Sequence, residues 1–201
     1  MSNAQFTVKE SLKENITDLE GFSQQQWDEH WKLYNGYVSN ANELNSELHQ
    51  ARQQKREDKF VQDRRRMLSF ELSGIYLHEI FFGLIKNGGT PMSTEFKNIL
   101  AKHFGSVEQL HAEMMNCAKT RGVGWSCLYY DKERDHMFVG RVELHQNGHP
   151  AGLPIVMALD NWEHGYIIDC GAGPSGLAKF LELVHPHINW KAIEDRYNTL
   201  V

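Results

Sequence analysis

The sequence lacks several features that define specialised classes of protein. It has no apolar run approaching the length of about 18 residues that a membrane-spanning helix needs, so we expect no membrane association. The three cysteines are an odd number in no C-x-x-C spacing, which argues against a disulfide framework and a cysteine-based zinc site. The formal net charge of −5 excludes a generally basic nucleic-acid binder. With no basic-then-apolar signal pattern at the N-terminus, we expect a cytoplasmic protein.

The composition is otherwise that of an ordinary globular protein, with 201 residues of which 41% are hydrophobic and 23% charged. This length buries a sizeable core without disulfides. Histidine is the outlier, at 11 residues, which prompts a search for metal ligands. We expect Met1–Ala4 to be partly a cloning remnant outside the fold.

The stretch 37–73 predicts helix, because it has no Gly or Pro and is rich in Glu, Gln, Lys, Arg and Leu. A single helix of this length would measure about 55 Å, which is too long for a compact protein of this size. We therefore expect the chain to turn back within the polar segment 53–58, giving an antiparallel hairpin of helices over 23–50 and 58–86. Ser23, three residues before Gln26, predicts the start of the first helix.

The pattern changes after Gly88-Gly89 and Pro91, which we expect to end the second helix. We predict an all-helical first half and an antiparallel α+β second half. Its expected elements are helices over 93–103 and 106–119, strands over 123–131, 136–143 and 153–159, a loop over 171–176, and helices over 177–185 and 190–198.

The hairpin itself points to two candidate metal ligands. His30 and His78 have their midpoint at residue 54, inside the predicted turn. Residues equidistant from an antiparallel turn lie at the same level, so both imidazoles can approach one point. Tyr34 and Tyr37 follow His30 at i+4 and i+7 and share its helix face. The alternative is that both histidines are partly buried and bonded only to the backbone.

A second pair of candidates follows the last predicted strand. Asp160 ends the apolar run 153–159, and His164 comes four residues later, where it can place a nitrogen beside the carboxylate. In the alternative, Asp160 and Glu163 only cap a helix, with His164 on the surface. Together with His30 and His78, the pair offers three imidazoles and one carboxylate, a set suited to iron or manganese.

These residues lie in motifs that resemble the iron/manganese superoxide dismutase family. The resemblance runs collinearly from about residue 22 to 197. It is carried by D-x-W-E-H at 160–164 with Tyr166, by His78 followed by Phe81-Phe82, by the G-x-G-W stretch ending at Trp125, by His103-Phe104-Gly105-Ser106, and by Asn189-Trp190.

The resemblance implies an N-terminal antiparallel helical hairpin domain, residues 1–88, followed by an α/β domain with a three-stranded antiparallel sheet, residues 89–201. One Fe or Mn ion per subunit would lie between them, held by His30, His78, Asp160 and His164. The implied function is that of an antioxidant enzyme, converting superoxide into dioxygen and hydrogen peroxide.

Further roles follow from the resemblance residue by residue. Tyr37 best matches the tyrosine that guards substrate entry. The family commonly has one residue more between its first ligand and this tyrosine than separates His30 from Tyr37, so Tyr34 stays as a rival. Where the family holds a side chain against metal-bound solvent, Gly74 cannot serve, and His145 is expected, with Gln146 as fallback. Trp125 is expected beside this site.

The family's dimer contact is matched only in part. Glu163 resembles the glutamate that crosses a homodimer interface, and it would there orient His164 of the other subunit. The alternative is that Glu163 only caps a helix. Gly173 stands where the family has an arginine, and the family's proline-rich opening is absent, so anion steering and dimer packing are expected to differ. The rival function is a dismutase-like fold kept as a structural or interaction module. A three-histidine, one-carboxylate oxygenase is less favoured, because such sites usually lie in all-β barrels.

Three other features receive structural interpretations. The basic excess over 51–66 is taken as a solvated hairpin tip rather than a nucleic-acid or partner site. His149, His185 and His187 are interpreted as loop and surface histidines rather than a second metal site. Cys117 in a helix, Cys127 in a strand and Cys170 at a strand end are interpreted as packing residues.

Overall fold

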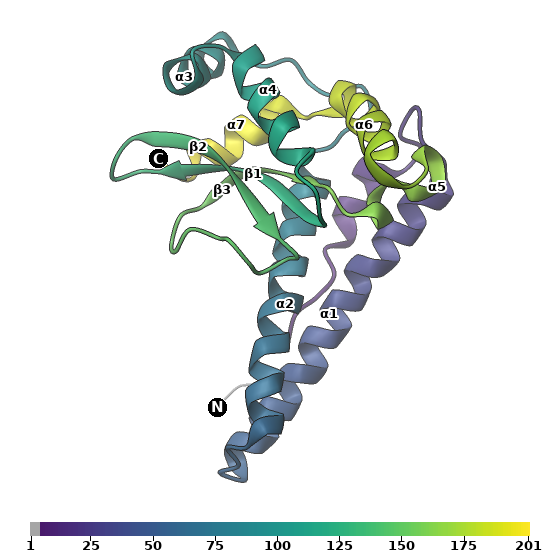
Figure 1. Ribbon diagram of the computed structural model, residues 1–201, viewed down its shortest axis with the longest axis vertical. Coiled ribbons are helices and arrows are strands. Elements are labelled where there is room, and N and C mark those ends of the chain that lie inside the picture. The colour runs from purple at the N-terminus through teal and green to yellow at the C-terminus, as the bar shows by residue number, and fades with distance from the viewer. Residues whose placement is uncertain (1–4) are drawn as a thin grey trace.

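The computed structural model describes residues 5–201, so Met1–Ala4, which we expected to be partly a cloning remnant, lie outside the described residues. A helical hairpin comes first and a mixed α/β region follows (Figure 1). In chain order the elements are η1 (Glu10–Ile16), α1 (Gln24–Gln53), α2 (Lys59–Gly83), α3 (Thr94–Phe104), α4 (Val107–Ala118), β1 (Gly124–Asp131), β2 (His136–Glu143), β3 (Ile155–Asp160), η2 (Glu163–Gly165), α5 (Ile167–Cys170), α6 (Gly173–Val184), η3 (His185–His187) and α7 (Trp190–Asn198).

The predicted antiparallel hairpin is confirmed. The Ser23 side chain accepts a hydrogen bond from the Gln26 backbone N–H at the start of α1. Asp58 caps α2 in the same way, through the backbone N–H of Val61. The two helices pack along their length, and their tip extends well beyond the sheet (Figure 1). The Asp58 cap lies at the turn itself, so it helps to fix where α2 begins after the polar segment, whereas the Ser23 cap fixes the far end of α1.

The second helix ends earlier than predicted. It stops at Gly83 instead of continuing to residue 86, and Ile85 just beyond it forms an isolated antiparallel bridge with Ile188. The Lys86 N–H donates to the His187 carbonyl at 2.8 Å, and the Asn189 N–H donates to the Leu84 carbonyl at 3.0 Å. Backbone hydrogen bonds to a distant segment therefore replace those of another helical turn.

The second half contains the predicted three-stranded antiparallel sheet, in the order β2-β1-β3. Trp125 pairs with Asp160, which places the end of β3 beside the start of β1. Helix α4 packs on β1 and β2, while α2 contacts β3. The sheet thereby connects directly to the hairpin helix that carries His78.

Two predictions after β3 are wrong. Residues 173–176 are not loop but the first turn of α6, because Pro174 in a first helical turn needs no N–H partner. A Cβ atom on Gly176 would lie 1.8 Å from the Gly171 carbonyl oxygen, so this glycine permits close backbone approach and not a flexible loop. Cys170 ends the short helix α5 and not a strand.

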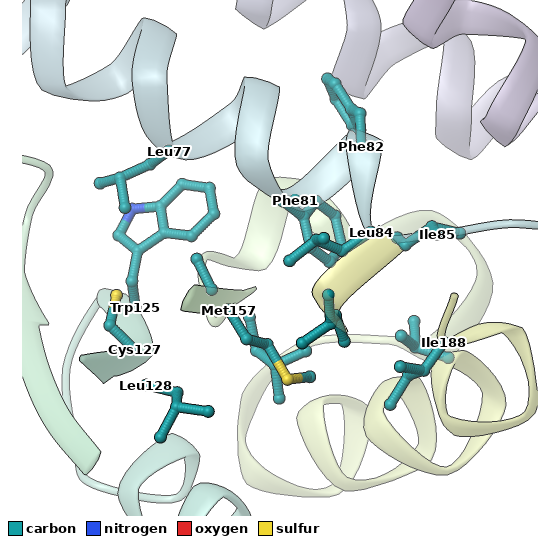
Figure 2. Packing of buried hydrophobic residues seen from close by; sticks show 14 of the residues in the cluster. Leu77, Phe81, Phe82, Leu84, Ile85, Trp125, Cys127, Leu128, Met157 and Ile188 are labelled. Carbon is teal, nitrogen blue, oxygen red and sulfur yellow. The ribbon is translucent and has the colours of Figure 1, made fainter. Parts of the chain in front are cut away.

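One hydrophobic core joins the hairpin to the sheet. Figure 2 shows Leu77 and Phe81 of α2 pointing toward the region that holds Trp125 and Met157 of the sheet. All four side chains are at most 4% exposed. Within residues 5–201, every helix is too short or too polar to cross a membrane. The core fixes α2 against the end of β3, where the candidate ligands lie.

Candidate metal centre

Four buried or nearly buried side chains meet between the hairpin and the sheet. His30 comes from α1, His78 from α2, Asp160 from the end of β3 and His164 from η2. One ligand atom from each lies within 4.8 Å of those of the other three. Asp160 Oδ2 is 3.0 Å from His30 Nε2, 3.6 Å from His78 Nε2 and 3.4 Å from His164 Nε2. The structure thus brings together all four residues expected as ligands.

The backbone aims Asp160 at the imidazoles. The Trp162 backbone N–H donates to Asp160 Oδ1 at 2.8 Å, which leaves Oδ2 facing the three histidines. The helix-capping alternative for Asp160 is not what is seen: η2 has Trp162 as its N-cap and no side-chain cap, and the Asp160 carboxylate instead bonds within the turn that precedes it. One oxygen holds the turn after β3, and the other remains available as a ligand atom.

A backbone contact sets the tautomer of His78. His78 Nδ1 lies 2.7 Å from the Gly74 carbonyl oxygen, one helical turn earlier. A carbonyl only accepts, so Nδ1 carries the proton and Nε2 keeps its lone pair. Within the described chain, His78 Nε2 and His164 Nε2 are buried without a hydrogen-bond partner. A proton on one ring nitrogen and a free lone pair on the other is the usual arrangement of a metal-ligating histidine.

Burial and mutual charge set the ionisation of the cluster. Burial lowers the pKa of His30 and of His78, so both imidazoles are neutral near pH 7. Burial alone would raise the pKa of Asp160, but His164 and His30 outweigh it and hold this carboxyl below its usual range. A carboxylate beside the neutral imidazoles of His30 and His78 is the ionisation state that metal binding requires.

The donor chemistry fits iron or manganese. Three imidazole nitrogens and one carboxylate oxygen form a mixed, borderline-hard donor set. Such a set suits iron or manganese, whereas a structural zinc site usually contains cysteine thiolates. Over residues 5–201, no other group of three or more His, Cys, Asp or Glu side chains brings its ligand atoms this close. Three imidazole nitrogens of the cluster are buried without a hydrogen-bond partner among the described residues, namely His30 Nδ1, His78 Nε2 and His164 Nε2, and a bound ion would satisfy the two Nε2 atoms.

A chain of three side chains lies against this cluster. The Trp125 indole N–H donates to His145 Nδ1 at 3.0 Å. Because indole only donates, Nδ1 accepts, and neutral His145 carries its proton on Nε2. That nitrogen lies 2.9 Å from the Tyr37 hydroxyl, whose oxygen accepts the hydrogen bond. The Tyr37 O–H is therefore free to donate elsewhere.

The pKa values of His145 and Tyr37 are shifted in opposite directions. Burial lowers the pKa of His145 to about 4, so its imidazole is neutral at pH 7. Burial raises the pKa of Tyr37, and the negative charge of Asp160 raises it further, so the phenol stays protonated. The chain of Trp125, His145 and Tyr37 is thus uncharged at neutral pH and holds one transferable phenolic proton.

The two candidate tyrosines occupy different positions. The ring centroid of Tyr37 is 5.1 Å from that of His78, and the side chain is half-buried. Tyr34 is fully buried, and its hydroxyl donates to Glu79 at 3.1 Å and accepts from the Lys9 N–H at 3.1 Å. Burial raises the pKa of Tyr34 to about 12. Its hydroxyl is bonded to these other groups, whereas that of Tyr37 reaches His145.

The structure gives a steric reason why position 74 is a glycine. A Cβ atom on Gly74 would lie 3.0 Å from the Tyr37 ring, closer than ordinary van der Waals contact. Tyr37 therefore occupies the space in which a larger residue at position 74 would extend. Gln146, the fallback candidate, instead accepts a hydrogen bond from the His145 backbone N–H through its side chain.

Glu163 lies on the surface beside the cluster. Its Oε1 accepts from the Gly173 backbone N–H at 3.0 Å. Gly173, which the resemblance places where an arginine would be expected, therefore contacts Glu163 through its backbone. Over the described residues, His164 Nδ1 has no hydrogen-bond partner. The exposed side chains of Ile167 and Ile168 follow along the same segment.

The sequence analysis missed one buried residue of the site, Gln26, and wrongly placed His187 on the surface. Gln26 is fully buried; its amide donates to the His164 carbonyl at 2.7 Å and accepts from the Ile168 N–H at 3.0 Å. Its position in the helix cap was the only available signal. His187, expected on the surface, is only 4% exposed because it bridges the Glu20 carbonyl and the Gly88 N–H.

Comparison with known proteins gives matches over nearly the whole chain. Residues 10–86 match the family model described as iron/manganese superoxide dismutases, alpha-hairpin domain, and residues 92–196 match the C-terminal domain of the same family. Three relatives are named superoxide dismutase. The [Fe] protein of Methanothermobacter thermautotrophicus is 32% identical over 86% of this chain and 84% of its own length. The [Fe] protein of Mycobacterium tuberculosis is 29% identical over 84% and 80%. The [Mn/Fe] protein of Aeropyrum pernix is 30% identical over 83% and 78%.

Proposed function

Because the chain belongs to the iron/manganese superoxide dismutase family, we propose that it is an antioxidant enzyme that converts two superoxide ions and two protons into dioxygen and hydrogen peroxide. The observation that carries this proposal is the approach of His30, His78 and His164 to one oxygen of Asp160. These four side chains come from four separate elements of the fold.

The four residues would hold one Fe or Mn ion per subunit. A bound ion of this kind supplies the one-electron redox chemistry of the reaction. The protein fixes the donors before the ion arrives, because the Gly74 carbonyl orients His78 and the Trp162 N–H orients Asp160. Gln26 fixes the backbone of His164 in the same way. These contacts limit how far each donor can move when the ion is oxidised or reduced.

Proton supply falls to the chain of Tyr37, His145 and Trp125. Neutral His145 donates from Nε2 to the Tyr37 oxygen, so the Tyr37 O–H is directed to a further acceptor. A protonated, half-buried phenol at this position can donate to reduced oxygen and recover its proton from solvent. We therefore assign the entry role to Tyr37 and a structural role to Tyr34.

A homodimer would complete the second coordination sphere. Glu163 of one subunit would accept a hydrogen bond from the Nδ1–H of the other subunit's His164, which has no partner of its own among the described residues. Exposed apolar side chains beside Glu163 support burial of this face, namely Val123, Ile167 and Ile168. Gly173 offers no charged side chain there, so steering of superoxide by this face is weaker than an arginine would give.

The domain division and the location complete the proposal. We divide the chain into a hairpin domain, residues 1–88, and an α/β domain, residues 89–201. We place the protein in the cytoplasm, because its cysteines are free thiols, as expected in a reducing compartment. A role as a purely structural module is not favoured, because such a module would not need three imidazoles aimed at one buried carboxylate.

The direct test is superoxide dismutation by protein loaded separately with iron and with manganese. We expect turnover far above that of the free aquo-ion with at least one metal, and one metal ion per chain by elemental analysis. Turnover no higher than that of the aquo-ion with both metals would overturn the enzymatic proposal and favour the structural one.

A further inference from the structure

A second group of metal-ligating side chains lies in a surface groove between α4 and α6. The groove has a volume of about 340 Å³. Helix α4 contributes His111 and Met115, and its C-cap residue Lys119 follows at the same interval of four residues, so the three share one face. Leu181 and Glu182 of α6 and His185 at its end form the other wall.

The two imidazoles meet in this groove. The ring centroids of His111 and His185 are 4.5 Å apart, with the planes inclined at 68°. Across residues 5–201, neither ring has a hydrogen-bond partner. His187, two residues after His185, differs because both of its ring nitrogens have one. His111 is half-buried and His185 exposed, so their ring nitrogens remain open to a ligand from solvent.

Burial and the neighbouring ring favour the uncharged form of His111. Burial lowers the pKa of His111, and the neighbouring His185 lowers it further. Two adjacent imidazoles resist being protonated together. An uncharged His111 ring offers a nitrogen lone pair, which is the state that binds a metal ion.

From this juxtaposition we propose a second metal site, in which His111 and His185 bind a copper ion with Met115 as the third donor. Imidazole suits several divalent ions, and Cu²⁺ is the most tightly bound of the first-row series. The thioether of Met115, one helical turn after His111, adds a soft donor that favours Cu⁺. Two imidazoles and a thioether together select copper over iron, manganese or zinc.

This site is separate from the centre described above. Its ligands lie on α4 and at the end of α6, whereas the four-residue cluster lies on α1, α2, β3 and η2. No residue is shared between the two sets. The proposal therefore does not depend on dismutase activity.

The test is titration of the purified full-length protein with Cu²⁺, after its iron and manganese content has been measured. We expect one Cu²⁺ per chain, with nitrogen hyperfine coupling from two imidazoles in its electron paramagnetic resonance spectrum. His111→Gln and His185→Gln should each weaken binding by about tenfold or more. His136→Gln is the control, since it alters an exposed histidine on β2, and it should leave Cu²⁺ binding unchanged. Constant iron and manganese content shows that copper has not exchanged into the four-residue cluster.

The thioether is tested with Cu⁺ under anaerobic conditions, by competition with a chromogenic chelator. Met115→Leu keeps the apolar volume and should weaken Cu⁺ binding while leaving Cu²⁺ binding nearly unchanged. Equal affinity of wild type, His111→Gln and His185→Gln for Cu²⁺ would overturn the site. Loss of binding in His136→Gln to the same extent would do so too, and an unaltered Cu⁺ affinity in Met115→Leu would remove the thioether from it.

Discussion

The Tyr37 hydroxyl lies 2.9 Å from His145 Nε2, and this contact joins the first helix of the hairpin to the loop after β2. The indole N–H of Trp125 fixes the direction of the hydrogen bond, because it occupies the other nitrogen of His145. The phenol is therefore an acceptor toward His145, and its own O–H is free to donate to another group.

Removing this hydroxyl should separate turnover from metal binding. In Tyr37→Phe we expect full metal content and a fall in kcat of about a hundredfold, the lower range for loss of a positioned proton donor. Stopped-flow decay of superoxide measures it. Tyr34→Phe is the matched control, because its hydroxyl bonds to Glu79 and the Lys9 N–H. It should cost about 1 kcal/mol of unfolding free energy and leave kcat intact. The reverse pattern would transfer the entry role to Tyr34.

Metal retention should depend on His78. His78→Ala removes a buried donor whose Nε2 faces Asp160 and has no other described partner. We expect the purified variant to contain less than about a tenth of the wild-type metal. Elemental analysis beside Tyr37→Phe, which keeps all four donors, gives the comparison. Wild-type metal content in His78→Ala would remove this residue from the ligand set.

The sequence predicted the parts of the fold that depend on local signals. The hairpin follows from helix formers on either side of a polar turn, and the three strands from apolar runs between turn residues. The symmetry of His30 and His78 about residue 54 anticipated that their imidazoles meet. The end of α2 was misplaced because Asn189, more than a hundred residues away, supplies the competing backbone bond. Gln26 was missed because a glutamine in a helix cap gives no sign that it will also fix the backbone of His164.

Gly74 tests how tightly Tyr37 is held. A Cβ atom there would lie 3.0 Å from the Tyr37 ring, so in Gly74→Ala the ring must shift by a few tenths of an ångström, and we expect this shift to weaken its bond to His145. We expect kcat to fall about tenfold or more with metal content unchanged. Gly36→Ala is the control, since Gly36 is also within a helix and has nothing within 4 Å of its added Cβ. That substitution should stabilise the fold by about 1 kcal/mol and leave activity unchanged. Wild-type activity in Gly74→Ala would show that the contact yields without cost.

The proposed dimer predicts a specific role for Glu163. Glu163→Gln keeps the size of the side chain and removes the charge that would pair with the partner's His164. We expect the dimer dissociation constant to rise about tenfold or more, measured by sedimentation at several protein concentrations. Glu133→Gln, an exposed substitution in the turn between β1 and β2, should have no effect. An unchanged dissociation constant in Glu163→Gln would restrict Glu163 to its contact with Gly173.

Buried neutral histidines should make the metal-free protein sensitive to acid. The pKa of His145 is lowered to about 4 in the fold, against an ordinary value of 6.5 in the unfolded chain. Between these values the unfolded chain binds more protons, so the free energy of unfolding falls as pH drops from 6.5 toward 4. For His145 alone, we expect a loss of about 2 kcal/mol between pH 7.5 and pH 5. The lowered pKa values of His30 and His78 act in the same direction. Urea unfolding of metal-free wild type and His145→Gln at both pH values isolates this share, because glutamine cannot titrate. The variant should lose less stability on acidification than the wild type; an equal loss would mean that His145 is already protonated in the folded protein at pH 5.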